Sequence, residues 1–251
     1  MLTFLEKKYR LYNKTTFIAS DPISIPHQFT LLQDIEISGF LIATISWGQR
    51  KTILKNGNEL MERMGYEPFH FIQNFTTSDL KAFDNFVHRT FNSTDLKFFL
   101  RSLKKLYAEH SSMEDVISEN LTKYDDNLAQ AISSWRSYFL KGVKEQRVKK
   151  HFSDPLAGSA AKRINMFLRW MVRKDEFGVD FGRWQNIRPD QLICPLDIHS
   201  GRVARKLNLL TRSQNDWKAA VELTENLKTF DPKDPVKYDF ALFGLGVFEK
   251  F

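Results

Sequence analysis

A lysine and an aspartate, two residue types able to carry covalent catalysis, stand 35 positions apart in this chain. Lys162 lies near the start of a basic amphipathic stretch, and Asp197 follows a proline-leucine pair at the apparent start of another helix. A neutral lysine amine is a nucleophile, and a carboxylate beside it can orient it, accept its proton or stabilise positive charge on a sugar ring. The pair therefore indicates lyase chemistry on a sugar carbon.

Both residues also have a purely structural interpretation. A helical wheel places Lys162 on the same face as Arg169 and Arg173, opposite an apolar stripe made of Ile164, Phe167, Leu168 and Met171. That face is either the solvated side of an amphipathic helix or a cluster of cations that lowers the lysine pKa. Asp197 is a favoured N-cap that complements the helix dipole. The capping and catalytic roles of Asp197 are compatible, because a carboxylate held by backbone N–H groups stays ionised.

Composition limits the class of protein. The 251 residues, 42% of them hydrophobic and 22 of them phenylalanine, can bury a core without disulfides. Cys194 is the one cysteine, which excludes an internal disulfide, and the six histidines show no zinc-ligand spacing. No apolar run reaches 18 residues. We expect a cytoplasmic monomer without a membrane segment, metal or cofactor.

Positive charge is concentrated in one part of the chain. The net charge is +7, and residues 141–212 hold 16 Lys or Arg against 7 Asp or Glu, a local excess of nine. Such clustering is typical of a nucleic-acid-binding face, because each neutralised phosphate releases counterions. A solvated basic surface gives the same signal.

Hydrophobic periodicity predicts helix nearly throughout and hence an all-α fold. Apolar residues recur at helical spacing from the cap candidates Asn92 and Ser93 to about Tyr107, and again over residues 128–139. Asp234 and Pro235 fit the N-cap and first position of a helix that continues through Val247. We find no internal repeat and no linker long enough to separate independent domains.

Four segments resemble the helix-hairpin-helix superfamily of DNA glycosylases, in particular the 8-oxoguanine DNA glycosylase/lyases. These segments are Phe40–Gln49, the lysine at 162, the run Pro195-Leu196-Asp197-Ile198-His199, and Asp239–Gly246. The whole chain is also similar to an uncharacterised bacterial family that carries Lys-Arg-x-Asn-Met-Phe-Leu-Arg-Trp-Met-Val-Arg followed by Pro-Leu-Asp-x-His-x-Gly-Arg.

The resemblance implies a two-lobed, all-helical fold in one globular unit, 1–251. Residues 1–54 and 229–251 would form one lobe. Residues 55–228 would form a helical barrel that contains the hairpin region 150–173 and the helix from 197. The partner implied is double-stranded DNA with a damaged base, an oxidised purine, which is flipped out of the duplex. Lys162 would attack C1′ of that nucleotide, and Asp197 would assist.

The same resemblance assigns roles to further residues. Gln49 would fill the gap left by the flipped base, and other DNA contacts would come from Arg50, Lys51, Gly158, Ser159, Arg163, Arg169, Arg173, His199 and Arg202. Trp170, Phe181 or Trp184 would stack on the base. The chain departs from the family in having a single hairpin glycine, Gly158, and an inserted loop, residues 174–184.

Other classes of function stay open at this point. The same fold and basic surface would serve a non-catalytic nucleic-acid-binding protein. A third possibility is an RNA- or nucleotide-processing enzyme that uses the same lysine.

Overall fold

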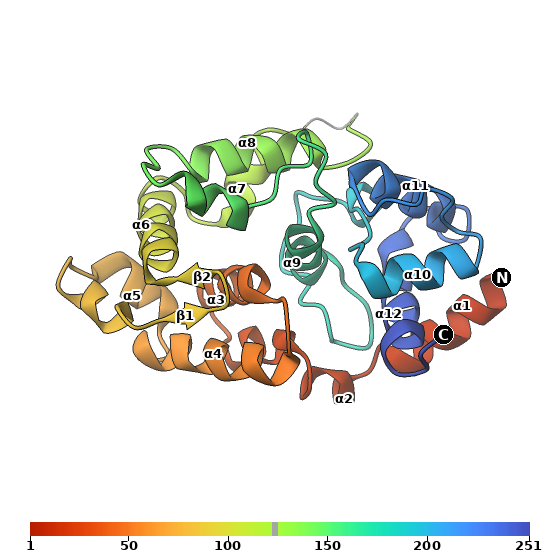
Figure 1. The fold of residues 1–251 in the computed structure, drawn as a ribbon, viewed down its shortest axis with the longest axis horizontal. Helices are drawn as coiled ribbons and strands as arrows, with labels where there is room; N and C mark the ends of the chain where they lie inside the picture. The colour runs from red at the N-terminus through yellow and green to blue at the C-terminus, as the bar shows by residue number, and fades with distance from the viewer. Residues whose placement is uncertain (122–124) are drawn as a thin grey trace. The chain divides into compact units, whose positions relative to one another are not determined.

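The structure is a computed structural model that describes residues 1–121 and 125–251. It is 60% helix and 2% strand, so the predicted all-α class is confirmed (Figure 1). The α-helices are α1 (Leu2–Tyr12), α2 (Thr15–Ile18), α3 (Leu32–Ile45), α4 (Arg50–Arg63), α5 (Pro68–Asn74), α6 (Ser93–Glu109), α7 (Met113–Ser118), α8 (Ala129–Phe139), α9 (Lys162–Val172), α10 (Ile198–Lys206), α11 (Trp217–Lys228) and α12 (Asp239–Val247). Strands β1 (Val87–His88) and β2 (Phe91–Asn92) form an antiparallel pair.

Within residues 1–121 and 125–251, six short 3-10 helices connect these elements. They are η1 (Pro22–Ser24), η2 (Pro26–Gln28), η3 (Asp79–Phe83), η4 (Gln146–His151), η5 (Pro189–Gln191) and η6 (Pro235–Tyr238). The helix expected to begin at Asp234 and Pro235 is in fact η6 followed by α12. Its predicted cap does not form, because the Asp234 side chain accepts hydrogen bonds from Arg173 and none from the helix backbone.

The chain folds into two compact units, each built from separated segments. The first unit comprises Met1–Ala19, Asn120–Ser133 and Ser153–Phe251, and the second comprises Ser20–Glu119 and Ser134–Phe152. These bounds differ from the predicted lobes, 1–54 with 229–251 and 55–228. The segment around Lys162 belongs with both ends of the chain, and so does Asp197.

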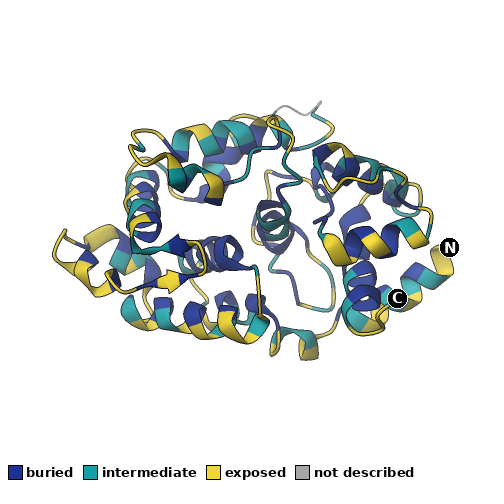
Figure 2. Cartoon of the chain, in the orientation of Figure 1, coloured by how far each residue is buried: buried dark blue, intermediate teal, exposed yellow. Residues whose placement is uncertain are grey.

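The second unit is built around α3, which is buried from Ile35 to Ile45 (Figure 2). Helices α4 and α5 pack against it. Phe40 is the centre of its aromatic core, with ring centroids 5.8 Å from Phe99 and 5.1 Å from Trp135. Helix α6 begins at the predicted cap, where Asn92 accepts hydrogen bonds from two backbone N–H groups of the first turn.

In the first unit α12 packs against both α1 and α10 (Figure 1). Gly244 permits the close approach of α1, because a Cβ atom there would clash with the ring of Tyr12. That ring is held in place by two contacts. It stacks on Phe248 at a centroid distance of 5.5 Å, and the Tyr12 hydroxyl hydrogen-bonds to Glu249.

Gly244→Ala should therefore destabilise the protein by about 1–3 kcal/mol, the usual cost of overpacking. The gain in helix propensity, about 1 kcal/mol, is smaller than this cost. Urea unfolding followed by circular dichroism measures the loss. In a Tyr12→Ala background the same substitution should no longer destabilise, and an equal loss in both backgrounds would contradict the contact.

Candidate active site

The chain enters α9 through a tight turn. Gly158 has a φ of 87°, and its N–H donates to the carbonyl of Pro155 at 2.9 Å. The Gly158 carbonyl accepts from Trp217 N at 3.0 Å, which ties the turn to the start of α11. Ala161, the residue before the helix, is left-handed with a φ of 46°, and its N–H donates to Ser159 Oγ at 3.2 Å. The turn thus fixes the point at which α9 begins.

Lys162 is the first residue of α9, and its ammonium faces the start of α10. Lys162 Nζ lies 3.7 Å from Asp197 Oδ2, and each of the two side chains is 29% exposed. At this distance the two groups form an ion pair, but they are too far apart for a hydrogen bond. Both side chains also stay partly open to solvent.

The two oxygens of Asp197 have different partners. Oδ1 caps α10, accepting from His199 N at 2.8 Å and from Ser200 N at 3.0 Å. Oδ2 faces Lys162 instead. Asn215 Nδ2 donates to the Asp197 carbonyl at 3.1 Å and so holds the backbone from the other side. Capping therefore positions the carboxylate without using the oxygen nearest the lysine.

Sequence reasoning did not find Asp239, a buried carboxylate that interacts with this pair. Asp239 opens α12, is 7% exposed, and accepts a hydrogen bond from Arg169 Nη1. Burial raises its pKa to about 6. The positive charges of Arg169 and Lys162 lower that pKa, whereas the negative charge of Asp197 raises it. Asp239 lies in one of the segments of family resemblance, but nothing in the sequence separates it from an ordinary first-turn aspartate.

The shifted pKa predicts a pH dependence of stability. The folded protein holds the Asp239 proton up to about pH 6, whereas an unfolded chain releases it near pH 3.8. The stabilisation from this proton is therefore complete below pH 3.8 and lost as the pH rises through 6. Asp239→Asn should remove this component. Urea unfolding from about pH 4 to 7 should show wild type losing stability relative to the variant, and a difference constant with pH would contradict the assignment.

A second buried charge cluster surrounds Arg173, at the end of α9. Its guanidinium lies 2.9 Å from Asp180 and 2.7 Å from Asp175, and it also pairs with Asp234 at 2.9 Å. Its Nη2 donates to Tyr9 Oη at 2.7 Å. Burial lowers the Arg173 pKa, but the surrounding carboxylates outweigh burial and raise it.

The structure does not place Arg169 and Arg173, which are predicted DNA contacts, on a solvated face. Arg169 is 5% exposed and Arg173 is fully buried. The reason is the loop 174–184, which folds back along α9. Phe181 N donates to the Trp170 carbonyl at 2.7 Å, and Arg183 N donates to that of Met171 at 2.7 Å. A wheel drawn for one helix cannot show that a following loop covers its polar face.

Two of the three aromatic residues predicted to stack on a base are also core residues. Trp170 is fully buried, and Trp184 is 2% exposed and packs edge-on against Phe167 with ring centroids 5.4 Å apart. Neither ring is accessible to a base in this conformation. Phe181 is half-buried, so it alone keeps the accessibility that stacking requires.

The other predicted DNA contacts in the first unit lie at or near the surface. Gly158 and His199 are exposed, whereas Ser159 and Arg163 are half-buried. Burial lowers the pKa of Arg163 to about 10, which leaves it charged at neutral pH. Arg202 is exposed and donates to the Gly246 carbonyl at 3.1 Å. Ile198, which is not among the predicted DNA contacts, is 77% exposed directly after Asp197.

Gln49, Arg50 and Lys51 lie in the second unit, where Gln49 is the N-cap residue of α4. Gln49 and Lys51 are exposed and Arg50 is half-buried. The Gln49 side chain makes no capping hydrogen bond. The predicted early helix ends at Ile45, so Gln49 stands in the turn before α4 and not at the end of α3.

Within residues 1–121 and 125–251, no group of three or more His, Cys, Asp or Glu side chains is arranged to hold a metal ion. No helix in that part of the chain combines the length and the apolar character needed to cross a membrane.

Fold and site together define an all-helical protein with a solvent-accessible lysine–aspartate pair at two helix N-termini. The chain belongs to the family described as "Protein of unknown function (DUF2400)", whose family model matches residues 21–248. No curated protein and no solved structure matches the chain.

Proposed function

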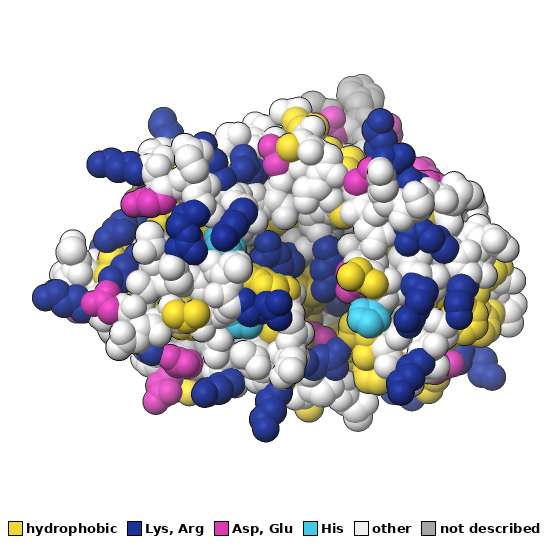
Figure 3. Space-filling view, viewed as in Figure 1, with side chains coloured by type: hydrophobic (Ala, Val, Ile, Leu, Met, Phe, Trp, Pro, Cys, Tyr) yellow, Lys and Arg dark blue, Asp and Glu magenta, His cyan; other side chains and the backbone are white. Residues whose placement is uncertain are grey.

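We propose that this protein is a DNA repair glycosylase with AP-lyase activity, in which Lys162 is the nucleophile. The observation that carries the proposal is the 3.7 Å approach of Lys162 Nζ to Asp197 Oδ2 with both side chains open to solvent. Basic side chains on the surface support a polyanionic partner, since Lys and Arg are spread over the face in Figure 3 with fewer Asp and Glu among them. The choice of an oxidised purine as substrate rests on the family resemblance.

The proposed reaction begins with a proton leaving the Lys162 ammonium, with Asp197 Oδ2 placed to receive it. The freed electron pair on Nζ forms a bond to C1′ of the flipped nucleotide. The bond from C1′ to the base breaks, and its electron pair leaves with the base, which takes up the proton held by Asp197 and so restores the carboxylate. The sugar ring then opens to an imine between Nζ and C1′. Removal of a C2′ proton expels the 3′ phosphate by β-elimination.

Asp197 has two tasks in this scheme. Its negative charge stabilises the oxocarbenium-like sugar as the base departs. Its Oδ1 atom accepts hydrogen bonds from two backbone N–H groups and keeps the carboxylate in place, while Oδ2 accepts the lysine proton. A preorganised carboxylate avoids the cost of reorientation during the reaction.

Borohydride trapping tests the proposal. The protein is incubated with short duplexes that carry 8-oxoguanine, uracil, an oxidised pyrimidine or an abasic site, with an undamaged duplex as control. Borohydride delivers hydride to C1′ of the imine and leaves a stable amine, and peptide mass mapping then locates the bond. An adduct on Lys162 with one damaged base supports the proposal and names the substrate. Salt-sensitive binding to every duplex without any adduct would favour the non-catalytic nucleic-acid-binding protein.

Asp197→Asn should slow base release by about 10²–10³-fold, the usual effect of removing one charge-stabilising group. Asparagine caps a helix about as well as aspartate, so the thermal midpoint and DNA affinity should change little. Single-turnover kinetics on the trapped substrate measure the rate, and circular dichroism measures stability. A lower thermal midpoint with an unchanged rate of base release would show that Asp197 acts only as a helix cap.

A further inference from the structure

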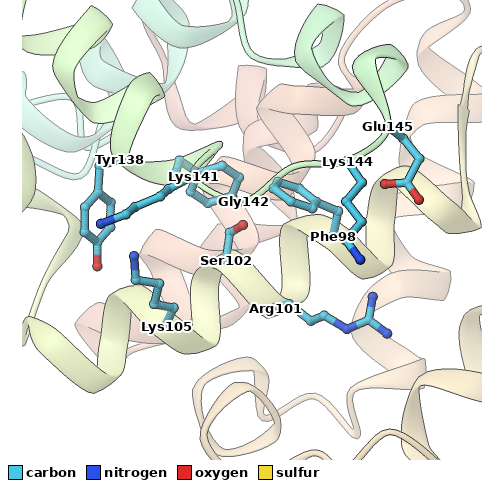
Figure 4. A pocket seen from close by; sticks show the side chains of 10 residues that line it. Phe98, Arg101, Ser102, Lys105, Tyr138, Lys141, Gly142, Lys144 and Glu145 are labelled. Atoms are coloured by element: carbon cyan, nitrogen blue, oxygen red, sulfur yellow. The ribbon is translucent and has the colours of Figure 1, made fainter.

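A second candidate site, unrelated to the lysine–aspartate pair, is a pocket in the second unit (Figure 4). It has a volume of about 480 Å³ and lies between α6 and the end of α8 with the segment that follows it. Arg101 and Lys105 line it from α6, and Lys141 and Lys144 line it from the other side. The volume is within the usual range of small-molecule sites.

The charge of this pocket is strongly positive. Glu145 is the one acidic residue in the lining, so four cations and one carboxylate leave a net of three positive charges. Figure 4 shows Glu145 at the end of the pocket opposite Tyr138. Arg101 and Lys105 are also one helical turn apart on α6, a spacing at which like charges repel. An anion bound between these side chains would relieve that repulsion.

Two of the four cations, Arg101 and Lys144, are not neutralised by the protein itself, whereas Lys105 and Lys141 interact with the carboxylate of Glu109. In the described part of the chain Arg101 and Lys144 form no ion pair, and both are exposed. Lys105 Nζ lies over the ring of Tyr138, 4.6 Å from its centroid, which directs this ammonium toward the far wall. Two charged side chains are thus free for a ligand, and a third is held in position.

An independent observation comes from Ser102, whose side chain lies in the middle of the pocket lining (Figure 4). The residue is only 8% exposed, and its hydroxyl makes no hydrogen bond to any residue that the structure describes. The protein does not enclose the hydroxyl, so a ligand in the pocket can reach it. The hydroxyl is therefore a ready donor to an oxygen atom of a ligand.

We propose that this pocket binds a phosphorylated nucleotide ligand through two of its phosphate groups. Each wall supplies a pair of cations, which suits two phosphates better than one. The Arg101 guanidinium can contact a phosphate through two parallel N–H groups, and Ser102 can donate to another oxygen. Phe98, a half-buried residue of the lining, offers an apolar surface to the nucleoside. Two such phosphates occur in a free nucleoside diphosphate and at the 5′-phosphorylated end of a nucleic-acid strand.

Isothermal titration calorimetry on the full chain tests this proposal at low salt. The probes are ADP, pyrophosphate and adenosine, together with a short single strand carrying or lacking a 5′ phosphate. We expect ADP or the phosphorylated strand to bind, adenosine not to bind, and affinity to fall as salt is added. Binding of ADP identifies a free nucleotide as the ligand, whereas preference for the phosphorylated strand identifies a strand end. Failure of every phosphate probe to bind would overturn the proposal.

Variants locate the binding to this pocket. Arg101→Ala combined with Lys144→Ala should weaken binding by about 100-fold, and Ser102→Ala by about tenfold, from the loss of hydrogen bonds to a charged group. Lys55→Ala combined with Lys81→Ala removes the same charge from exposed positions of the second unit outside the pocket and should leave the affinity unchanged. Equal weakening in the two charge variants would show non-specific attraction. The result is separate from trapping on Lys162, since the pocket lies in the other unit.

Discussion

Lys162→Ala should abolish borohydride trapping on every damaged duplex. Without the amine no bond to C1′ can form, so the expected loss is total and not a reduced rate. Folding should be preserved, because the lost ion pair is 3.7 Å long and partly exposed, and such pairs contribute about 0–1 kcal/mol. The comparison requires equal amounts of folded protein, checked by thermal unfolding.

Lys218→Ala is the matched control for this experiment. Lys218 is an exposed lysine on α11 in the same unit, and its substitution makes the same change in net charge. It should trap as wild type does. If the Lys162 variant keeps its lyase activity, the proposed nucleophile is wrong. If wild type forms no trapped adduct and Lys162→Ala loses DNA binding, Lys162 is instead a phosphate contact.

Arg173→Met should destabilise the protein by about 3–5 kcal/mol, the largest stability effect that we expect from a single substitution here. The Arg173 guanidinium is fully buried and interacts with three carboxylates, those of Asp175, Asp180 and Asp234. Removing it leaves these charges without their common counter-ion in a desolvated site. Urea unfolding at neutral pH measures the loss.

Two further variants separate charge from geometry at this position. Arg173→Lys keeps the charge but not the planar fork that reaches several carboxylates, so an intermediate loss is expected. Arg183→Met changes an exposed arginine of the same loop region and should stay within about 0.5 kcal/mol of wild type. A loss below about 1 kcal/mol for Arg173→Met would show that the cluster contributes little net stability.

Local signals in the sequence were sufficient to predict several elements. The cap at Asn92 and the apolar spacing after it located α6, and the stripe that includes Phe167 and Leu168 is the buried side of α9. Asp197 is the N-cap of α10, as predicted. These features depend on neighbours within a few residues, which a single sequence displays directly.

The features that sequence reasoning missed depend on contacts between distant segments. Arg169 looked solvated because its partners, Asp180 and Asp239, come from a covering loop and from the last helix. Trp170 and Trp184 looked available for stacking because composition does not distinguish core aromatics from exposed ones. The pairing of Lys162 with Asp197 was expected from the family resemblance, and spacing alone would not have brought the two residues together.

The division of the first unit into three segments has a consequence for the order of synthesis. All residues of the second unit have been made once synthesis reaches Phe152. Helix α1 is made first, but it packs against α12, which is made last. On a ribosome the second unit can therefore fold first, while α1 stays without its packing partner. The lysine and the aspartate are both made after that unit is complete, so nascent chains arrested before α12 should bury the α3 core yet lack a finished lysine–aspartate site.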